Sequence, residues 1–126
     1  MIKKAVFIIC MIFSFFCCAQ KPKFVSYTPV EFEKFLNENS SIQLVDVRRY
    51  DEYSVGHINN AIVIDVLASD FISKADSLLE KSRPVAVYCR SGKRSKDAAN
   101  KLTERGFDVH ELNNGYNGWV EYLKQK

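Results

Sequence analysis

The sequence has little of several features that would each indicate a particular class of protein. Histidine occurs only at His57 and His110, and no cluster of cysteines or carboxylates accompanies either one, so a zinc site has no support. The chain of 126 residues contains 3 prolines and 5 glycines, and no segment rich in either divides it into domains. The net charge of +3, from 18 basic and 15 acidic residues, is too small to indicate a nucleic-acid-binding protein. A length and a hydrophobic content (47%) of this size predict one compact domain.

The N-terminal segment differs from the rest of the chain and predicts export. Lys3 and Lys4 form a basic start, and residues 5–19 follow with Ser14 as their only conventionally polar side chain. A charged start, a short apolar stretch and small residues at its end are typical of a secretory signal peptide, here residues 1–19. The stretch is short for a transmembrane helix of about 20 residues. Two lysines just beyond it leave an uncleaved anchor as an alternative.

Two kinds of processing fit the end of this segment. Cys17 or Cys18 at the end of an apolar run resembles the lipid-attachment site of bacterial lipoproteins, in which the cysteine is lipidated and becomes the new N-terminus. Alternatively, Cys17 and Ala19 are the small pair of a signal-peptidase site, which gives a soluble protein starting at Gln20. Both readings place the protein outside the bacterial cytoplasm. It is either in the periplasm or held at the membrane only by its N-terminal anchor.

Removing the leader changes the meaning of the cysteines. Cys10, Cys17 and Cys18 lie within it, so the remaining chain keeps Cys89 alone and has no internal disulfide. The 106 residues after Gln20 hold 16 of the basic residues and all 15 acidic ones. We expect residues 20–24 to be a short tether and residues 25–126 to form one domain that depends on its hydrophobic core.

Strand-like and helix-like segments alternate along this domain. Short apolar runs predict strands at 24–27, 42–47, 61–64, 85–88 and 107–112. Helical spacing and end signals predict helices at 29–37, 51–55, 66–81, 95–105 and 116–123. This alternation predicts an α/β domain with a mainly parallel sheet covered on both faces. Because sites in such sheets lie beyond the carboxyl ends of the strands, the segment after Tyr88 is the first candidate.

That segment, the Cys89 loop, joins a buried strand to a helix and reads Cys89-Arg90-Ser91-Gly92-Lys93-Arg94-Ser95. Successive backbone N–H groups in such a turn form a nest for an anion, and the start of the following helix adds partial positive charge. Arg90, Lys93 and Arg94 add three cations, and Gly92 permits a sharp turn. These features lower the pKa of a thiol, so Cys89 is predicted to be a nucleophile rather than a small buried hydrophobe.

The Cys89 loop closely resembles the active-site loop of single-domain rhodaneses. Three further motifs in the order of that family are Asp46-Val47-Arg48, then Glu52-Tyr53 with Gly56-His57-Ile58, Ala61 and Ile64, then Leu112 to Gly115 with Trp119. The resemblance covers residues 25–123. It implies a three-layer α/β/α fold with a mainly parallel five-stranded sheet. The sequence departs from the family at Asn59-Asn60, where Pro-Gly is usual, and at Asn113-Asn114-Gly115, which replaces a glycine pair.

The resemblance implies sulfur transfer through a persulfide on Cys89, without a cofactor. A small anionic donor such as thiosulfate supplies the sulfur, and a thiol or cyanide accepts it; an envelope redox protein is a possible partner. Residues 90–95 are implied to bind the anion, with Arg94 the strongest candidate, although each cation could equally be a solvated surface residue. Asp46 and Arg48 are implied to brace the surrounding loops. His57 is expected to be a hydrogen-bonded structural residue rather than a base.

Other functions remain as alternatives. A non-enzymatic persulfide carrier or binding module would use the same cysteine but turn over thiosulfate poorly. Cysteine-dependent phosphatases use Cys-x5-Arg, and the spacing from Cys89 to Arg94 is one residue shorter. An inactive scaffold would have no need of this cation-rich string.

Overall fold

The computed structural model describes residues 23–126 of the chain. The predicted signal peptide (1–19), the lipidation candidates Cys17 and Cys18, and the first part of the expected tether lie outside the described residues. Within residues 23–126 there is no helix with the length and apolar character needed to cross a bilayer.

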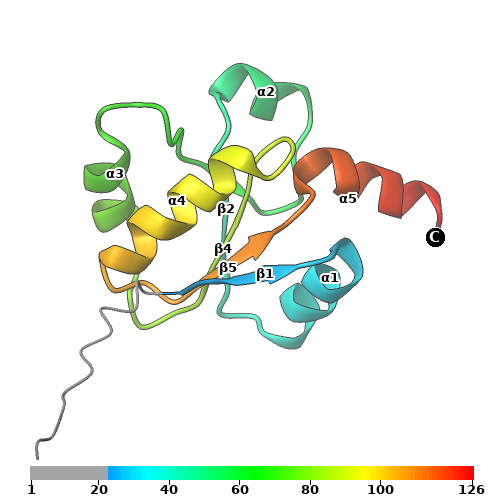
Figure 1. Cartoon of the computed structure of the whole chain (residues 1–126), viewed down its shortest axis with the longest axis horizontal. Coiled ribbons are helices and arrows are strands. Elements are labelled where there is room, and N and C mark those ends of the chain that lie inside the picture. Colours follow the sequence, from blue (N-terminus) through cyan, green and yellow to red (C-terminus); the bar gives the residue numbers. More distant parts are fainter. Residues whose placement is uncertain (1–22) are drawn as a thin grey trace, which may run out of the picture.

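A single sheet of five parallel strands forms the centre of the domain (Figure 1). The strands are β1 (Val25–Tyr27), β2 (Gln43–Asp46), β3 (Ile62–Val63), β4 (Val85–Tyr88) and β5 (Val109–Leu112). Their order across the sheet is β1-β5-β4-β2-β3. The predicted α/β fold with a five-stranded parallel sheet is confirmed. Every strand pairing in it is parallel.

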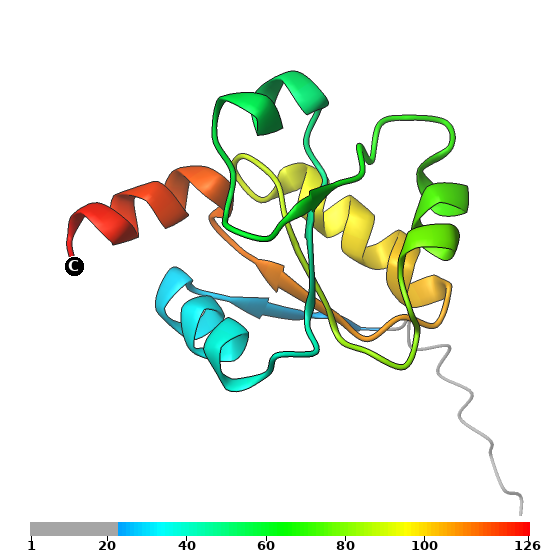
Figure 2. The same ribbon diagram turned by 180° about the vertical axis from the view of Figure 1, so that it is seen from behind.

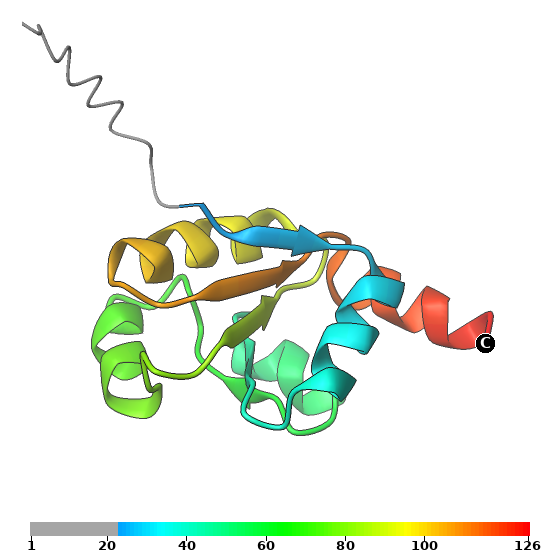
Figure 3. The same ribbon diagram turned by 90° about the horizontal axis from the view of Figure 1, so that it is seen from below.

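Helices cover both faces of this sheet (Figure 3). They are α1 (Pro29–Glu38), α2 (Tyr50–Val55), α3 (Phe71–Leu78), α4 (Lys93–Glu104) and α5 (Gly115–Lys124). Helices α3 and α4 pack on one face, and α1 and α5 pack on the other. The chain thus forms the three layers that the sequence predicted.

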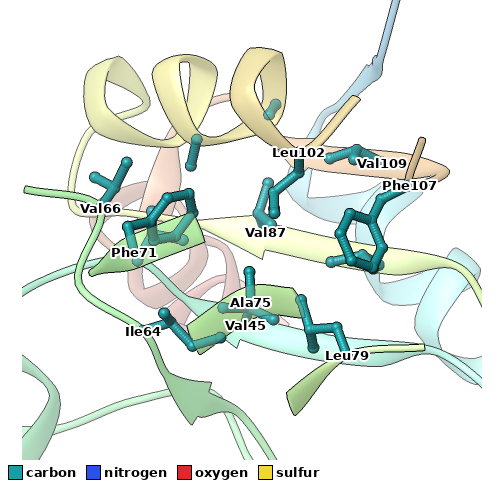
Figure 4. Packing of buried hydrophobic residues seen from close by; sticks show 14 of the residues in the cluster. Val45, Ile64, Val66, Phe71, Ala75, Leu79, Val87, Leu102, Phe107 and Val109 are labelled. Atoms are coloured by element: carbon teal, nitrogen blue, oxygen red, sulfur yellow. The ribbon is translucent and has the colours of Figure 1, made fainter. Parts of the chain in front are cut away.

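The alternation of side chains in β4 separates two hydrophobic cores. Val85 and Val87 point toward α3 and α4, where they pack against apolar residues of both helices (Figure 4). Ala86 and Tyr88 point the other way, toward α1 and α5. Because successive side chains of a strand alternate, the next residue, Cys89, lies on the α3/α4 side and is counted in that core.

Helix α1 begins where its end signals predict. The Thr28 hydroxyl accepts the Glu31 N–H at 3.3 Å, and the Glu31 carboxylate accepts the Thr28 N–H at 2.9 Å. Pro29 occupies the first helical position, where its missing N–H costs no hydrogen bond. This reciprocal cap directs the chain from the edge strand β1 back over the sheet.

The predicted helix over 66–81 is wrong at both ends, since α3 spans only Phe71–Leu78. The Asp65 carboxylate accepts the Leu67 N–H at 2.9 Å, a local turn that competes with helix formation. Leu67 and Leu78, whose helical spacing would place them on the buried face of a helix over 66–81, are 64% and 57% exposed. Val66 is buried, but it lies in the loop before α3 and not in the helix.

Candidate active site

Cys89 lies at the carboxyl end of the central strand β4, where the neighbouring strands also end. The turn that follows it is placed between α2 and the start of α5 (Figures 1 and 2). Cys89 is 1% exposed and is a free thiol. The predicted nucleophile, Cys89, is therefore buried at the edge of the sheet where the carboxyl ends of the strands meet.

The loop surrounds the sulfur with hydrogen-bonding groups. The Gly92 N–H donates to Cys89 Sγ at 3.1 Å, and the Ser95 hydroxyl lies 3.5 Å from the same atom. Burial raises the pKa of the Cys89 thiol, but hydrogen bonds from the Ser95 side chain and from the backbone of Ser95, Gly92 and Ser91 outweigh it and hold the pKa below its ordinary value. The arrangement favours a nucleophilic thiolate.

Helix α4 starts earlier than the sequence indicated. The sequence predicts a helix over 95–105, but the helix begins at Lys93, and Ser95 lies fully buried in its first turn. Gly92 precedes the helix with φ 108°, a left-handed conformation that favours glycine. A Cβ at this position would lie 2.0 Å from the Asn113 carbonyl oxygen. Glycine therefore lets the loop close against the turn after β5.

The start of α5 holds the other side of the loop. The Tyr116 N–H donates to the Cys89 carbonyl at 2.8 Å, and the Asn117 N–H donates to the Arg90 carbonyl at 3.0 Å. Gly115 has φ 61°, and a Cβ there would lie 2.5 Å from the Arg90 carbonyl group. Two carbonyls of the loop, those of Cys89 and Arg90, thus accept hydrogen bonds from α5, while the Gly92 N–H of the loop faces the sulfur.

The three cations of the loop have different surroundings. Arg90 and Lys93 are exposed, and neither forms an ion pair with a residue of the described part of the chain. Arg94 instead donates to both carboxylate oxygens of Glu52 on α2, at 2.7 and 2.9 Å. This hydrogen-bonded ion pair lowers the pKa of Glu52 to about 2. Arg94, the strongest anion-binding candidate by sequence, thus ties the start of α4 to α2.

Asp46 and Arg48 form a buried ion pair beneath the site. Arg48 donates to the Asp46 carboxylate through Nε at 3.0 Å and through a terminal nitrogen at 2.7 Å. The same guanidinium donates to the Gly56 carbonyl at 2.7 Å and lies 4.5 Å from the centre of the Tyr116 ring. It therefore joins the end of β2 to the segment after α2 and to α5.

His57 is exposed and lies away from the sulfur network. Its Nδ1 is 2.9 Å from the Tyr53 carbonyl oxygen, and its ring stacks on Tyr53 at 3.8 Å between centroids. Both contacts are local to α2 and the segment that follows it.

Sequence reasoning missed a buried acidic group next to the thiol. Glu111 on β5 is fully buried, and its carboxylate is hydrogen-bonded by Ser26, Ser95 and Lys96. The alternation of Phe107, Val109 and Glu111 was visible in the sequence and places Glu111 on an inward position. A carboxylate at such a position was the available signal. No group of three or more potential metal ligands occurs among residues 23–126.

The sequence model of the family described as the rhodanese-like domain matches residues 28–122 of the chain. The chain belongs to the rhodanese family. The thiosulfate sulfurtransferase GlpE of Shewanella oneidensis is 36% identical to it over 88 residues, which are 68% of this chain and 83% of that protein. The protein of the same name from Pseudomonas fluorescens is 38% identical over 93 residues, 72% of this chain and 81% of its own. The chain is a rhodanese-type enzyme.

Solved rhodanese structures share the fold. The rhodanese-like domain protein of Staphylococcus aureus superposes with a TM-score of 0.67 at 29% identity, covering 76% of this chain and 91% of its own. The rhodanese-related protein of Thermoplasma volcanium gives 0.68 at 25% identity, covering 79% and 93%.

The rhodanese domain accommodates its departures from the family pattern in two ways. Asn60, where glycine is usual, takes a left-handed backbone with φ 70°, which asparagine tolerates. In the turn after β5 the left-handed residue is Gly115, and neither Asn113 nor Asn114 takes a positive φ. Asn60 thus supplies the left-handed residue where Pro-Gly is usual, and Gly115 supplies it after β5, where a glycine pair is usual.

Proposed function

We propose that the protein moves a sulfur atom from thiosulfate or a similar donor to a thiol or cyanide. The Cys89 thiolate attacks the outer sulfur of the donor and forms a new S–S bond. The bond between the two donor sulfurs breaks, and sulfite leaves with its electron pair. The acceptor then attacks the outer sulfur of the Cys89 persulfide, and Cys89 leaves as a thiolate. The observation that carries the proposal is the Gly92 N–H donating to the Cys89 sulfur at 3.1 Å.

The charges of the site support an anionic donor and an anionic intermediate. Arg90 and Lys93 are exposed cations of the Cys89 loop and are free to attract a sulfonate group. Backbone N–H groups of the loop, which α5 holds by the Cys89 and Arg90 carbonyls, stabilise negative charge on a sulfur. A phosphatase is less well supported, because Arg94 is committed to Glu52 and the loop is one residue short.

Turnover of thiosulfate and cyanide by the purified protein tests this proposal. We expect thiocyanate to form catalytically and para-nitrophenyl phosphate to remain intact. A persulfide on Cys89 without turnover would instead indicate a sulfur carrier that needs a specific protein partner. Brisk phosphatase activity that depends on Cys89 would contradict the proposal.

We also propose that the protein is exported and works in the bacterial envelope, where thiols or redox proteins would be its acceptors. The basic start and apolar residues 5–19 support this location. Mass spectrometry of the mature N-terminus is expected to find a lipidated Cys17 or Cys18, which would anchor the domain at the membrane. An unmodified start at Gln20 would contradict lipidation, and an intact Met1 would contradict export with cleavage.

A further inference from the structure

The Glu111 carboxylate is buried below the Cys89 loop and connected to the thiol by a single hydroxyl. Its Oε2 lies 2.5 Å from Ser95 Oγ, and Ser95 Oγ lies 3.5 Å from Cys89 Sγ. Ser26 on β1 donates to the other carboxylate oxygen. Lys96, whose side chain is 43% exposed, reaches the same carboxylate with Nζ at 3.2 Å. Sheet register explains the proximity, since Glu111 is paired with Val87, two residues before Cys89.

Several acceptors compete for the hydroxyl proton of Ser95. The Ser95 hydroxyl has one proton and three acceptors within reach: Glu111, the Gly92 carbonyl at 3.1 Å and the sulfur. The Glu111 carboxylate oxygen is the nearest of the three, at 2.5 Å, so it accepts the hydrogen bond from the Ser95 hydroxyl. While it does so, Ser95 presents lone pairs to Cys89, which suit a thiol that donates. The Ser95 hydrogen bond that lowers the pKa of the thiol forms when the hydroxyl donates to the sulfur instead. To support a thiolate, the hydroxyl must turn away from Glu111.

We propose that Glu111 is a positioning residue that competes with Cys89 for the Ser95 proton and thereby limits how readily the thiol ionises. Ser26 and Lys96 also donate to the Glu111 carboxylate, so it keeps these hydrogen bonds when the Ser95 hydroxyl turns toward the sulfur. The Ser95 hydroxyl can therefore switch between the two acceptors. The consequence for turnover rests on the proposed function. The effect on the thiol itself does not.

Other charged groups around Cys89 are arranged differently from Glu111. They are Arg90, Lys93, Arg94 and Lys96 from the loop and α4, and, on the far side of Arg94, Glu52 from α2 and Asp65 from the segment after β3. Arg94 is paired with Glu52, and Lys96 is shared among Glu111, Asn113 and the Gly92 carbonyl. Among the described residues, Glu111 is the acid joined to the sulfur through one intervening hydroxyl.

The test is the pH dependence of Cys89 alkylation by iodoacetamide, a neutral probe, in the purified protein. Glu111→Gln keeps the shape of the side chain, removes its charge and offers an amide N–H to the Ser95 oxygen, which frees the Ser95 proton for the sulfur. We expect the midpoint of alkylation to fall by about one pH unit. Glu104→Gln, the same change at an exposed position at the end of α4, is the matched control and should leave the midpoint unchanged.

Glu111→Asp separates position from charge and serves if the Gln variant does not fold. It retains the carboxylate but shortens the side chain by one methylene, which withdraws it from Ser95, so we expect the midpoint to fall here as well. A midpoint that stays unchanged or rises in the folded variants would overturn the proposal. If the parent protein does not turn over thiosulfate, only the proposed function is contradicted. The alkylation shift is measured without a sulfur donor, so it tests the role of Glu111 separately.

Discussion

Replacing Cys89 by serine is expected to reduce sulfur transfer from thiosulfate to cyanide by about 10³-fold or more. A serine hydroxyl is not ionised at neutral pH and cannot form the persulfide on which the two-step route depends. The loss should appear in kcat, because the exposed cations Arg90 and Lys93 that attract the donor are unchanged. Steady-state thiocyanate formation measures it directly.

The same variant should fold like the parent protein. Serine has nearly the volume of cysteine and can accept the Gly92 N–H that the sulfur accepts at 3.1 Å. Urea unfolding of both proteins checks this point. Residual turnover above one tenth of the parent value in a folded Cys89→Ser protein would contradict the assignment of Cys89 as the nucleophile.

Replacing Asp46 by asparagine is expected to lower the free energy of unfolding by about 3–5 kcal/mol. The side chains of Asp46 and Arg48 are 0% and 5% exposed, so the change leaves a guanidinium charge buried without its partner. The Gly56 carbonyl accepts one hydrogen bond from Arg48 but carries no compensating charge. Urea unfolding of the purified protein measures the loss.

A surface pair provides the matched control for this prediction. Asp51 and Arg49 form an ion pair with side chains 72% and 57% exposed. Asp51→Asn should therefore leave the free energy of unfolding nearly unchanged, because solvent screens an exposed pair. Replacing Asp46 and Arg48 together, by leucine and methionine, should restore part of the lost stability because neither charge remains buried. A cost for Asp46→Asn as small as that for Asp51→Asn would refute the structural role given to the pair.

The parts of the fold set by local sequence could be predicted well. Strand β4 and the position of Cys89 directly after it follow from a short apolar run that ends in a cation-rich loop. Helix α1 follows from Thr28, Pro29 and Glu31, three residues whose contacts lie within one turn. Helix α3 was extended too far because a period of apolar residues does not reveal the local turn made by Asp65.

The parts of the site set by distant contacts could not be predicted. Arg94 and Glu52 are 42 positions apart in the chain, and only their tertiary placement makes the arginine a link rather than a free anion binder. Ser26 and Glu111 are 85 positions apart and meet because β1 and β5 pair in parallel. The spacing of residues along the sequence does not show which cation forms an ion pair and which stays unpaired.

The central claim is that Cys89 carries the transferred sulfur, and the intact mass of the protein after treatment with thiosulfate tests it most directly. Without an acceptor, the protein should gain about 32 Da, the mass of one sulfur atom, on Cys89, and should lose it when cyanide is added. The Cys89→Ser protein should show no gain. An unchanged mass in the parent protein, or a sulfur found on both proteins, would contradict the account.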